Sequence, residues 1–380
     1  MSSGRLKRED SRGRRNRPWR MASIRVDSGC KSAFLPAGRS LRGSGDLVGF
    51  DPHTSLRNDA ERRGPWCLCR ALAGGFNNVP YQMGLQPLIA QIPLATMTYD
   101  TPPAALRIPI LSVKDAGGSL GHQEYADNGA IIVPKVFRPD EMDEIRAVFT
   151  SKVEQDQTFA KIDHHIPADD ILSQYPRFVQ PHRFLDTEVG VLALQYMFDQ
   201  RLHSIAHSLI GPVYGAQSMF HFKPPTARGQ AMHQDNYFLQ THPETCMAAW
   251  IAIDDADREN GAIKVVPGSH KIPVICHENA DEGVSYAPMG LALPPGTETI
   301  LSSLKSGDVL FFHGSMLHGS DPNVSDRFRR CLIYHYIPQD SVKISQFFQP
   351  LVIPTGGETS IEVEPDGGPC GTGRAAVAAP

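Results

Sequence analysis

The pattern of hydrophobic and polar positions changes midway along the chain, from helix-like segments to short apolar runs separated by turns. A segment that starts at Pro139 opens with proline and acidic residues, which favour the first turn of a helix. Residues 187–210 predict one or two further helices, because they end in Gly211-Pro212, a typical helix stop. The apolar run 129–133 predicts a short strand ahead of these helices.

The second half of the chain predicts a β-rich core. Turn residues, such as those of Asn260-Gly261 and Gly307-Asp308, separate its apolar runs. The predicted strands cover residues 214–223, 246–254, 262–266, 308–313 and 328–337. Helices first and short strands afterwards indicate a mainly β fold, a sandwich or barrel with helices packed outside it.

Both ends of the chain differ from this body. Residues 1–100 contain 16 Lys and Arg against 8 Asp and Glu and show no sustained periodicity, which predicts a basic, disordered extension. Two alternatives are a start codon assigned too early, with translation beginning near Met83 or Met97, and an organelle transit peptide. We expect one domain over residues 104–350 and a flexible tail over residues 355–380.

Composition narrows the classes of function. The formal net charge of −4 combines +8 in the first hundred residues with −12 in the rest, and an acidic body argues against a nucleic-acid-binding surface. No run approaches the roughly 18 consecutive apolar residues that a membrane-spanning helix needs. The seven cysteines lack the paired spacing of a zinc site, and we expect neither structural zinc nor a disulfide framework but a reducing, cytoplasmic compartment.

A His-x-acid triplet is the first candidate for chemistry. A mononuclear iron site of the facial type needs two imidazoles and one carboxylate, and alternate residues of a strand point to the same side. Three such triplets start at His122, His233 and His242, where about 1.6 are expected by chance. His122 lies in a glycine-rich stretch and His242 lies beside a proline, whereas His233-Gln-Asp235 follows a predicted strand and its closing loop.

Further motifs follow this triplet in a characteristic order. They are the segment 260–271 (NGAIKVVPGSHK), the LHGS sequence at residues 317–320, and Arg329, eleven residues after His318. With His233-Gln-Asp235, this set resembles the phytanoyl-CoA dioxygenase family of iron(II)/2-oxoglutarate oxygenases over roughly residues 120–340. The resemblance implies a double-stranded β-helix core, the cupin-like jelly roll.

The resemblance also implies roles for single residues. His233, Asp235 and His318 correspond to the family's iron ligands, and Ser320 and Arg329 to contacts of the 2-oxoglutarate cosubstrate. Trp250 corresponds to a further cosubstrate contact, although it falls one residue short of the usual spacing from the triplet. Halogenating relatives replace the carboxylate ligand with alanine or glycine, so Asp235 points to hydroxylation or another oxidation.

Arg329 fits this role on physical grounds as well. It lies in the apolar strand predicted over residues 328–337, and a buried guanidinium needs an anionic partner. The distal carboxylate of 2-oxoglutarate would supply that partner in bidentate form, with the Ser320 hydroxyl beside it.

Each assignment has a competing interpretation. His313 is an alternative distal ligand, and Arg327 or Arg330 could replace Arg329, although strand alternation puts Arg330 on the opposite side. Trp250 and His270 could equally serve packing. The pairs His164-His165 and His203/His207 could bind metal, but they have no acidic motif nearby.

The function that we expect is hydroxylation of an aliphatic carbon of a small organic molecule, with iron(II), 2-oxoglutarate and O₂, giving succinate and CO₂. A metal oxygenase or isomerase without a keto acid, and a catalytically silent metal- and metabolite-binding protein, are the alternatives. The sequence indicates neither a nucleic-acid nor a membrane partner, and it leaves monomer and homodimer open. Residues 271–300 are rich in proline and show no clear hydrophobic periodicity, which predicts a lid that contacts the substrate.

Overall fold

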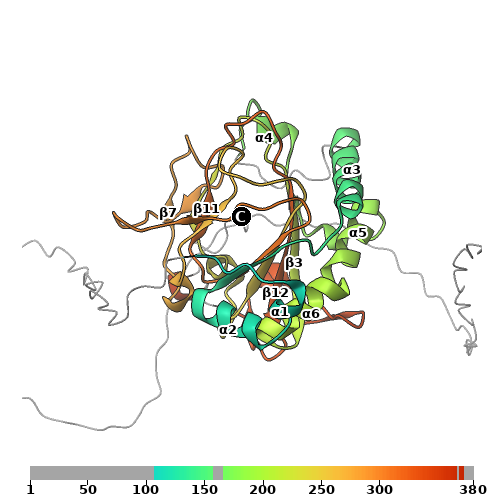
Figure 1. Ribbon diagram of the computed structural model, residues 1–380, viewed down its shortest axis with the longest axis vertical. Helices are drawn as coiled ribbons and strands as arrows, with labels where there is room; N and C mark the ends of the chain where they lie inside the picture. The colour runs from blue at the N-terminus through green and yellow to red at the C-terminus, as the bar shows by residue number, and fades with distance from the viewer. Residues whose placement is uncertain (1–106, 157–165, 366–367, 372–380) are drawn as a thin grey trace, which may run out of the picture. The chain divides into compact units, whose positions relative to one another are not determined.

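The computed structural model describes residues 107–156, 166–365 and 368–371, all within one unit, Gln91–Pro380 (Figure 1). The basic extension and the pair His164-His165 therefore lie outside the described residues.

Two antiparallel sheets form the core. The larger has the strand order β1-β10-β5-β12-β3-β14-β15, with β2 paired to β3, and the smaller has the order β4-β11-β6-β9. The larger sheet consists of β1 (Ala130–Val133), β2 (Phe178–Val179), β3 (Val213–His221), β5 (Met247–Ala252), β10 (Val309–His313), β12 (Cys331–Pro338), β14 (Leu351–Val352) and β15 (Glu358–Thr359). The smaller sheet consists of β4 (Gln230–His233), β6 (Ile263–Val265), β9 (Ile300–Leu301) and β11 (His318–Ser320).

The strand order is that of a jelly roll. Along the chain, β3, β5, β10 and β12 join the larger sheet, while β4, β6, β9 and β11 join the smaller one, so the chain crosses repeatedly between the two. Eight strands wound in this way make a double-sheet jelly roll. The structure therefore confirms the predicted double-stranded β-helix.

Strand alternation divides the larger sheet between two apolar layers. In β5, Ala249 and Ile251 pack toward the helices, whereas Ala248 and Trp250 pack between the sheets. In β10, Phe311 faces the helices in the same way and Phe312 the interior. The interior layer receives the side chains that can line a site.

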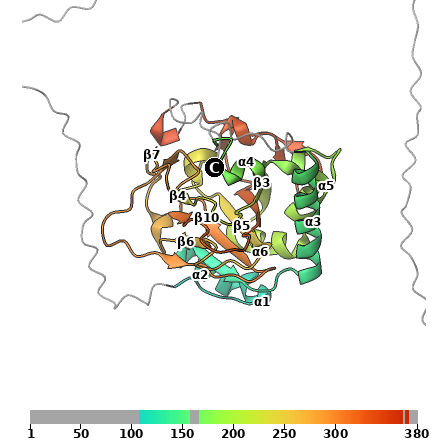
Figure 2. The ribbon, with the colours of Figure 1, turned by 90° about the horizontal axis from the view of Figure 1, so that it is seen from above.

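Helices cover the outer face of the larger sheet (Figures 1 and 2). The helices that contribute to this outer apolar layer are α1 (Val113–Ala116), α2 (Ser119–Asn128), α3 (Pro139–Gln155), α5 (Glu188–Met197) and α6 (Gln200–Ile210). The structure also describes the single-turn helices α4 (Ile171–Gln174) and α7 (Asn236–Leu239). In α3, Pro139 opens the first turn and Glu141 accepts a hydrogen bond from the Arg138 main chain, as the sequence predicts for a helix start. Phe149 of α3 stacks on Phe220 of β3 with ring centroids 4.1 Å apart, which fixes the helix on the sheet.

The described part of the C-terminal segment forms short strands and a turn. β15 pairs with β14, and β16 (Glu362–Val363) pairs in parallel with β13 (Lys343–Ile344). Cys370, in a short 3₁₀ turn, forms a disulfide with Cys276 of the segment 271–300. Residues 355–365 and 368–371 of the predicted tail thus pair with distant parts of the fold, and Cys276–Cys370 is one disulfide where the sequence predicts no disulfide framework.

Among the described helices, none has the length and apolar character that crossing a membrane requires.

Candidate metal and cosubstrate site

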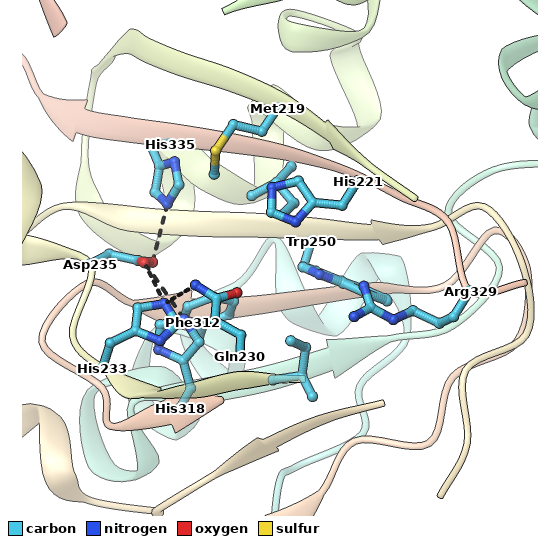
Figure 3. A pocket seen from close by; sticks show the side chains of 12 residues that line it. Met219, His221, Gln230, His233, Asp235, Trp250, Phe312, His318, Arg329 and His335 are labelled. Atoms are coloured by element: carbon cyan, nitrogen blue, oxygen red, sulfur yellow. Dashed lines mark hydrogen bonds and ion pairs between the residues drawn. The ribbon is translucent and has the colours of Figure 1, made fainter. Parts of the chain in front are cut away.

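Three candidate ligands converge where two strands of the smaller sheet meet. His233 ends β4, His318 begins β11, and the two are direct partners in the antiparallel pair β4–β11. Asp235 follows β4 at the start of α7, and its carboxylate faces both imidazoles from one side (Figure 3). Its Oδ1 is 3.5 Å from the Nε2 of His233 and 3.5 Å from the Nε2 of His318. All three side chains are buried.

Hydrogen bonds orient both imidazoles. The Nδ1 of His233 lies 2.9 Å from the carbonyl oxygen of Ala231, and the Nδ1 of His318 lies 2.9 Å from that of Met316. A carbonyl accepts only, so Nδ1 carries the proton and Nε2 keeps its lone pair. This is the tautomer that a metal-binding histidine needs.

The second carboxylate oxygen of Asp235 is also held. The Nε2 of His335, from β12, donates to the Asp235 Oδ2 at 3.1 Å. Burial opposes ionisation of Asp235, but the surrounding imidazoles, among them His335 with its hydrogen bond to Oδ2, hold the pKa of this carboxyl well below its usual range. Burial, with the charge of His233, lowers the pKa of His318 to about 4, which keeps this imidazole neutral at pH 7.

These side chains suit a divalent ion. Two ligands at about 2.1 Å from one ion and at a right angle are about 3 Å apart, close to the separations seen here. In the part of the chain that the structure describes, His233, Asp235 and His318 are the one group of three or more His, Cys, Asp or Glu that could hold a metal. Two imidazoles and one carboxylate are the donors of the iron facial triad.

Arg329 lies at the other end of the same pocket (Figure 3). Its side chain is 5% exposed, its Nη1 donates to the Sγ of Cys331 at 3.2 Å, and its Nε has no hydrogen-bond partner. No carboxylate of the described residues pairs with it. A buried guanidinium with an unused donor is a ready site for an anion. The pocket thus offers metal ligands at one end and hydrogen-bond donors for a carboxylate at the other.

The neighbouring arginines are engaged elsewhere. Arg330 donates to both carboxylate oxygens of Asp254, with its Nε 2.7 Å from Oδ2, and Arg327 pairs with Asp257 at 2.9 Å near the surface. Strand alternation explains the difference, because residues 329, 331 and 333 face the interior and Arg330 faces outward. The structure thus selects Arg329 for the pocket.

The remaining predicted contacts lie around this end of the pocket. Trp250 lines the pocket from β5, and the Arg329 Cζ is 5.4 Å from its ring centroid. Ser320 is buried two residues beyond His318 on β11 and pairs with Ile263, which lines the pocket. Its hydroxyl oxygen accepts a hydrogen bond from the Nζ of Lys223 at 2.9 Å.

The competing histidines lie apart from this cluster. The Nδ1 of His313 accepts a hydrogen bond from the Ser315 main chain, and its ring packs 5.5 Å from that of His270. Burial lowers the pKa of His313 to about 4, with a contribution from His270. The rings of His203 and His207 are 6.3 Å apart on α6. None of these four histidines joins the group around Asp235.

The sequence interpretation missed several side chains of the pocket. His335 shares the strand parity of Arg329 and could have been found by alternation along β12. His221 also lines the pocket, and its Nε2 has no hydrogen-bond partner; burial, with the charges of Arg177 and Arg329, holds its pKa well below the usual range. Gln230 could not be placed, because a bulge shifts the register between β4 and β11.

The segment 271–300 reaches the pocket. Its two short strands, β7 (Glu278–Asn279) and β8 (Met289–Gly290), pair with each other. Tyr286, between them, donates its hydroxyl proton to the Oε1 of Gln230 at 2.9 Å, and the Nε2 of Gln230 lies 3.1 Å from the Nε2 of His233. Gln234 holds the base of the segment, because its Oε1 accepts a hydrogen bond from the Ile275 main chain at 2.8 Å.

Comparisons with known proteins agree with this geometry. The sequence profile described as "Phytanoyl-CoA dioxygenase (PhyH)" matches residues 125–331, which is more than half of the chain. "Phytanoyl-CoA dioxygenase" from Arabidopsis thaliana is 30% identical over 160 residues, covering 41% of this chain and 56% of the relative. A "probable alpha-ketoglutarate-dependent hypophosphite dioxygenase" from Stutzerimonas stutzeri is 30% identical over 170 residues, covering 43% and 58%.

The chain thus spans little more than half the length of these two relatives. Among solved structures, the non-heme alpha-ketoglutarate-dependent carbocyclase SnoK from nogalamycin biosynthesis matches with a TM-score of 0.48 at 22% identity, covering 59% of this chain and 85% of SnoK. The family match contains all three residues of the candidate metal centre as well as Arg329. The chain belongs to the phytanoyl-CoA dioxygenase family of iron(II)- and 2-oxoglutarate-dependent oxygenases.

Proposed function

We propose that this protein hydroxylates an aliphatic carbon of a small organic molecule, with His233, Asp235 and His318 as the iron ligands and Arg329 as the anchor of 2-oxoglutarate. The observation that carries the proposal is one pocket with a facial set of ligands at one end and a guanidinium without an acidic partner at the other. A 2-oxo acid with a distal carboxylate has complementary groups at both of its ends.

Bound iron(II) and 2-oxoglutarate supply the oxidising chemistry, in which substrate, O₂ and 2-oxoglutarate give hydroxylated substrate, succinate and CO₂. The protein positions the metal and the cosubstrate and excludes water from the pocket. His233 and His318 present their Nε2 lone pairs, and His335 holds the outer oxygen of Asp235, so that only Oδ1 faces the metal position.

The far end of the pocket fixes the keto acid. Arg329 offers a fork of donors that matches a carboxylate, and Trp250, behind it, lets the guanidinium lie over an aromatic face. Apolar side chains line the space between the two ends, among them Ile263 and Phe312. They keep water away from the reacting atoms, and a dry pocket strengthens the charge pairing of Arg329 with its ligand.

We infer that the segment 271–300 contributes to substrate binding. Tyr286 is hydrogen-bonded to Gln230, whose amide nitrogen contacts the face of His233 that a metal would occupy. Metal binding would take the Nε2 lone pair and release this amide for a ligand. Two relatives, each 30% identical to this chain, carry names with unlike substrates, phytanoyl-CoA and hypophosphite, so the substrate screen covers chemically diverse small molecules.

The test is succinate formation. Copper, nickel and zinc bind such sites more tightly than iron(II), so the protein is first stripped with a chelator and reloaded with iron(II) without oxygen. A metabolite library is then scored for succinate release above the rate without substrate. Asp235→Ala should abolish the release, and Asp186→Ala, a change at an exposed carboxylate, should not.

The same assay separates the two alternatives. A catalytically silent protein binds iron and 2-oxoglutarate but releases no succinate with or without any substrate. A metal oxygenase or isomerase without a keto acid converts its substrate at a rate that does not depend on 2-oxoglutarate. Either result contradicts the proposal.

A further inference from the structure

A buried lysine lies beside the cosubstrate end of the pocket, and the proposed function leaves it without a role. Lys223 is 3% exposed. Its Nζ donates to the Oγ of Ser320 at 2.9 Å and to the carbonyl oxygen of Gly261 at 3.3 Å, and it also bonds the carbonyl oxygen of Asp321. An ammonium group has three protons, so these acceptors use all of them.

The fold is built to admit this lysine. Gly261 has a φ of +74° in the turn that follows Asn260, a conformation that glycine adopts without strain. A Cβ at this position would lie 2.5 Å from the Lys223 Nζ and 2.3 Å from the Asp321 carbonyl oxygen. A side chain at residue 261 would therefore displace the ammonium group from its acceptors.

Lys223 and Arg329 are close neighbours. The main-chain nitrogen of Arg329 donates to the carbonyl oxygen of Lys223 at 3.0 Å, next to the Cys331–His221 pair of β12 and β3. Over the described ranges, neither side chain forms an ion pair with a carboxylate. Burial, with the charge of Arg329, lowers the pKa of Lys223 well below its usual range, and an anion bound beside both side chains would favour their charged forms.

Ser320 connects the lysine to the pocket. It is the direct partner of Ile263 in the pair β11–β6, and Ile263 lines the pocket, so the Ser320 side chain lies on the pocket side of the smaller sheet. A hydroxyl group has one proton and two lone pairs. Because Lys223 donates to one lone pair, the proton of Ser320 is left to donate to a ligand.

We propose that Lys223 is a positioning residue that acts through Ser320 on the distal carboxylate of 2-oxoglutarate. By donating to the Ser320 oxygen, Lys223 fixes the hydroxyl group with its proton directed at that carboxylate, beside Arg329. The inference rests on the proposed function, since it assigns a second layer to the same cosubstrate site. It makes Lys223 a determinant of selectivity for keto acids that carry a second carboxylate.

The experiment is a double-mutant cycle on iron-loaded protein without oxygen. The variants are Lys223→Met, Ser320→Ala and both together, with Lys305→Met as the control, because Lys305 lies 81% exposed on a surface turn. Isothermal titration calorimetry measures the dissociation constants of 2-oxoglutarate and of 2-oxopentanoate, which has the same carbon chain without the distal carboxylate. Lys223→Gln is measured as a second, polar substitution. If either variant folds poorly, the binding stoichiometry falls, but the dissociation constant of the folded fraction can still be measured.

We expect Lys223→Met and Lys223→Gln to weaken 2-oxoglutarate about tenfold or more, the usual effect of losing a hydrogen bond that supports a charged ligand. Binding of 2-oxopentanoate should change less than about twofold, and the effect of Lys223→Met should largely vanish in the Ser320→Ala background. Equal weakening of both acids, additive effects of the two substitutions, or no effect would overturn the proposal. Failure of the wild-type protein to bind either acid would instead refute the proposed function.

Discussion

Replacing Arg329 by methionine should have different effects on 2-oxoglutarate binding and on the folding stability of the protein. The guanidinium is 5% exposed, has an unused Nε donor and forms no ion pair with a carboxylate of the described residues. If it anchors 2-oxoglutarate, truncation removes a buried charge-assisted pair, a loss of about 2–4 kcal/mol. That free energy corresponds to an increase of roughly 30- to 1000-fold in the dissociation constant. Calorimetric titration of the iron-loaded protein without oxygen measures it.

The same substitution should not destabilise the ligand-free protein. An unpaired buried charge costs free energy, and replacing it with an apolar side chain of similar volume is neutral or stabilising by about 1–4 kcal/mol. We therefore expect an unchanged melting temperature or a rise of up to about 16 °C, at about 2–4 °C per kcal/mol for a domain of this size. Differential scanning calorimetry of the metal-free protein measures this change.

Arg330→Met is the matched control. This neighbouring side chain donates to both oxygens of Asp254, so its loss should lower the melting temperature and leave the affinity for 2-oxoglutarate unchanged. The reasoning is refuted if Arg329→Met binds 2-oxoglutarate like the wild type, or if it destabilises the protein as much as Arg330→Met does.

Three further predictions concern single histidines and the segment 271–300. His318→Ala should abolish stoichiometric iron(II) binding, measured by equilibrium dialysis, whereas His313→Ala should retain it; loss in both variants or in neither contradicts the assigned ligand. Tyr286→Phe should raise the KM of a substrate found by the succinate screen and leave substrate-free succinate release unchanged, and an unchanged KM argues against a substrate contact. Burial, with the charge of Arg183, lowers the pKa of His182 to about 3, so its unfolded form takes up a proton below about pH 6.5 and the folded form does not. Between pH 6 and pH 4, the free energy of unfolding of the wild type, measured with urea, should therefore fall by about 1.4 kcal/mol per pH unit more than that of His182→Gln. Equal slopes for the two proteins would contradict burial of the neutral ring.

Much of the fold could be predicted because its strands carry a local signal. The apolar runs 246–254 and 308–313 form β5 and β10. The turn before β10 contains Gly307, whose positive φ favours glycine. Short strands such as β15 and β16 were missed, since pairing with distant segments, and not local sequence, defines them. The disulfide between Cys276 and Cys370 is of the same kind, because 94 residues separate the two cysteines.

The site divides in a similar way. Alternation along β12 predicts that Arg329 faces inward and Arg330 outward, and the structure confirms this orientation. The same rule reaches His335, six residues further on. Gln230 and Lys223 depend on a register shift and on a turn that admits an ammonium group, and neither feature can be derived from residue spacing.

The most direct test of the central claim is a crystal structure of the protein with manganese(II) and 2-oxoglutarate, located by anomalous scattering. We predict one metal peak within about 2.3 Å of the Nε2 atoms of His233 and His318 and of the Asp235 Oδ1, with the distal carboxylate of the keto acid on Arg329. A peak coordinated by His313 instead of His318, or a keto acid bound away from the Arg329 guanidinium, would contradict it.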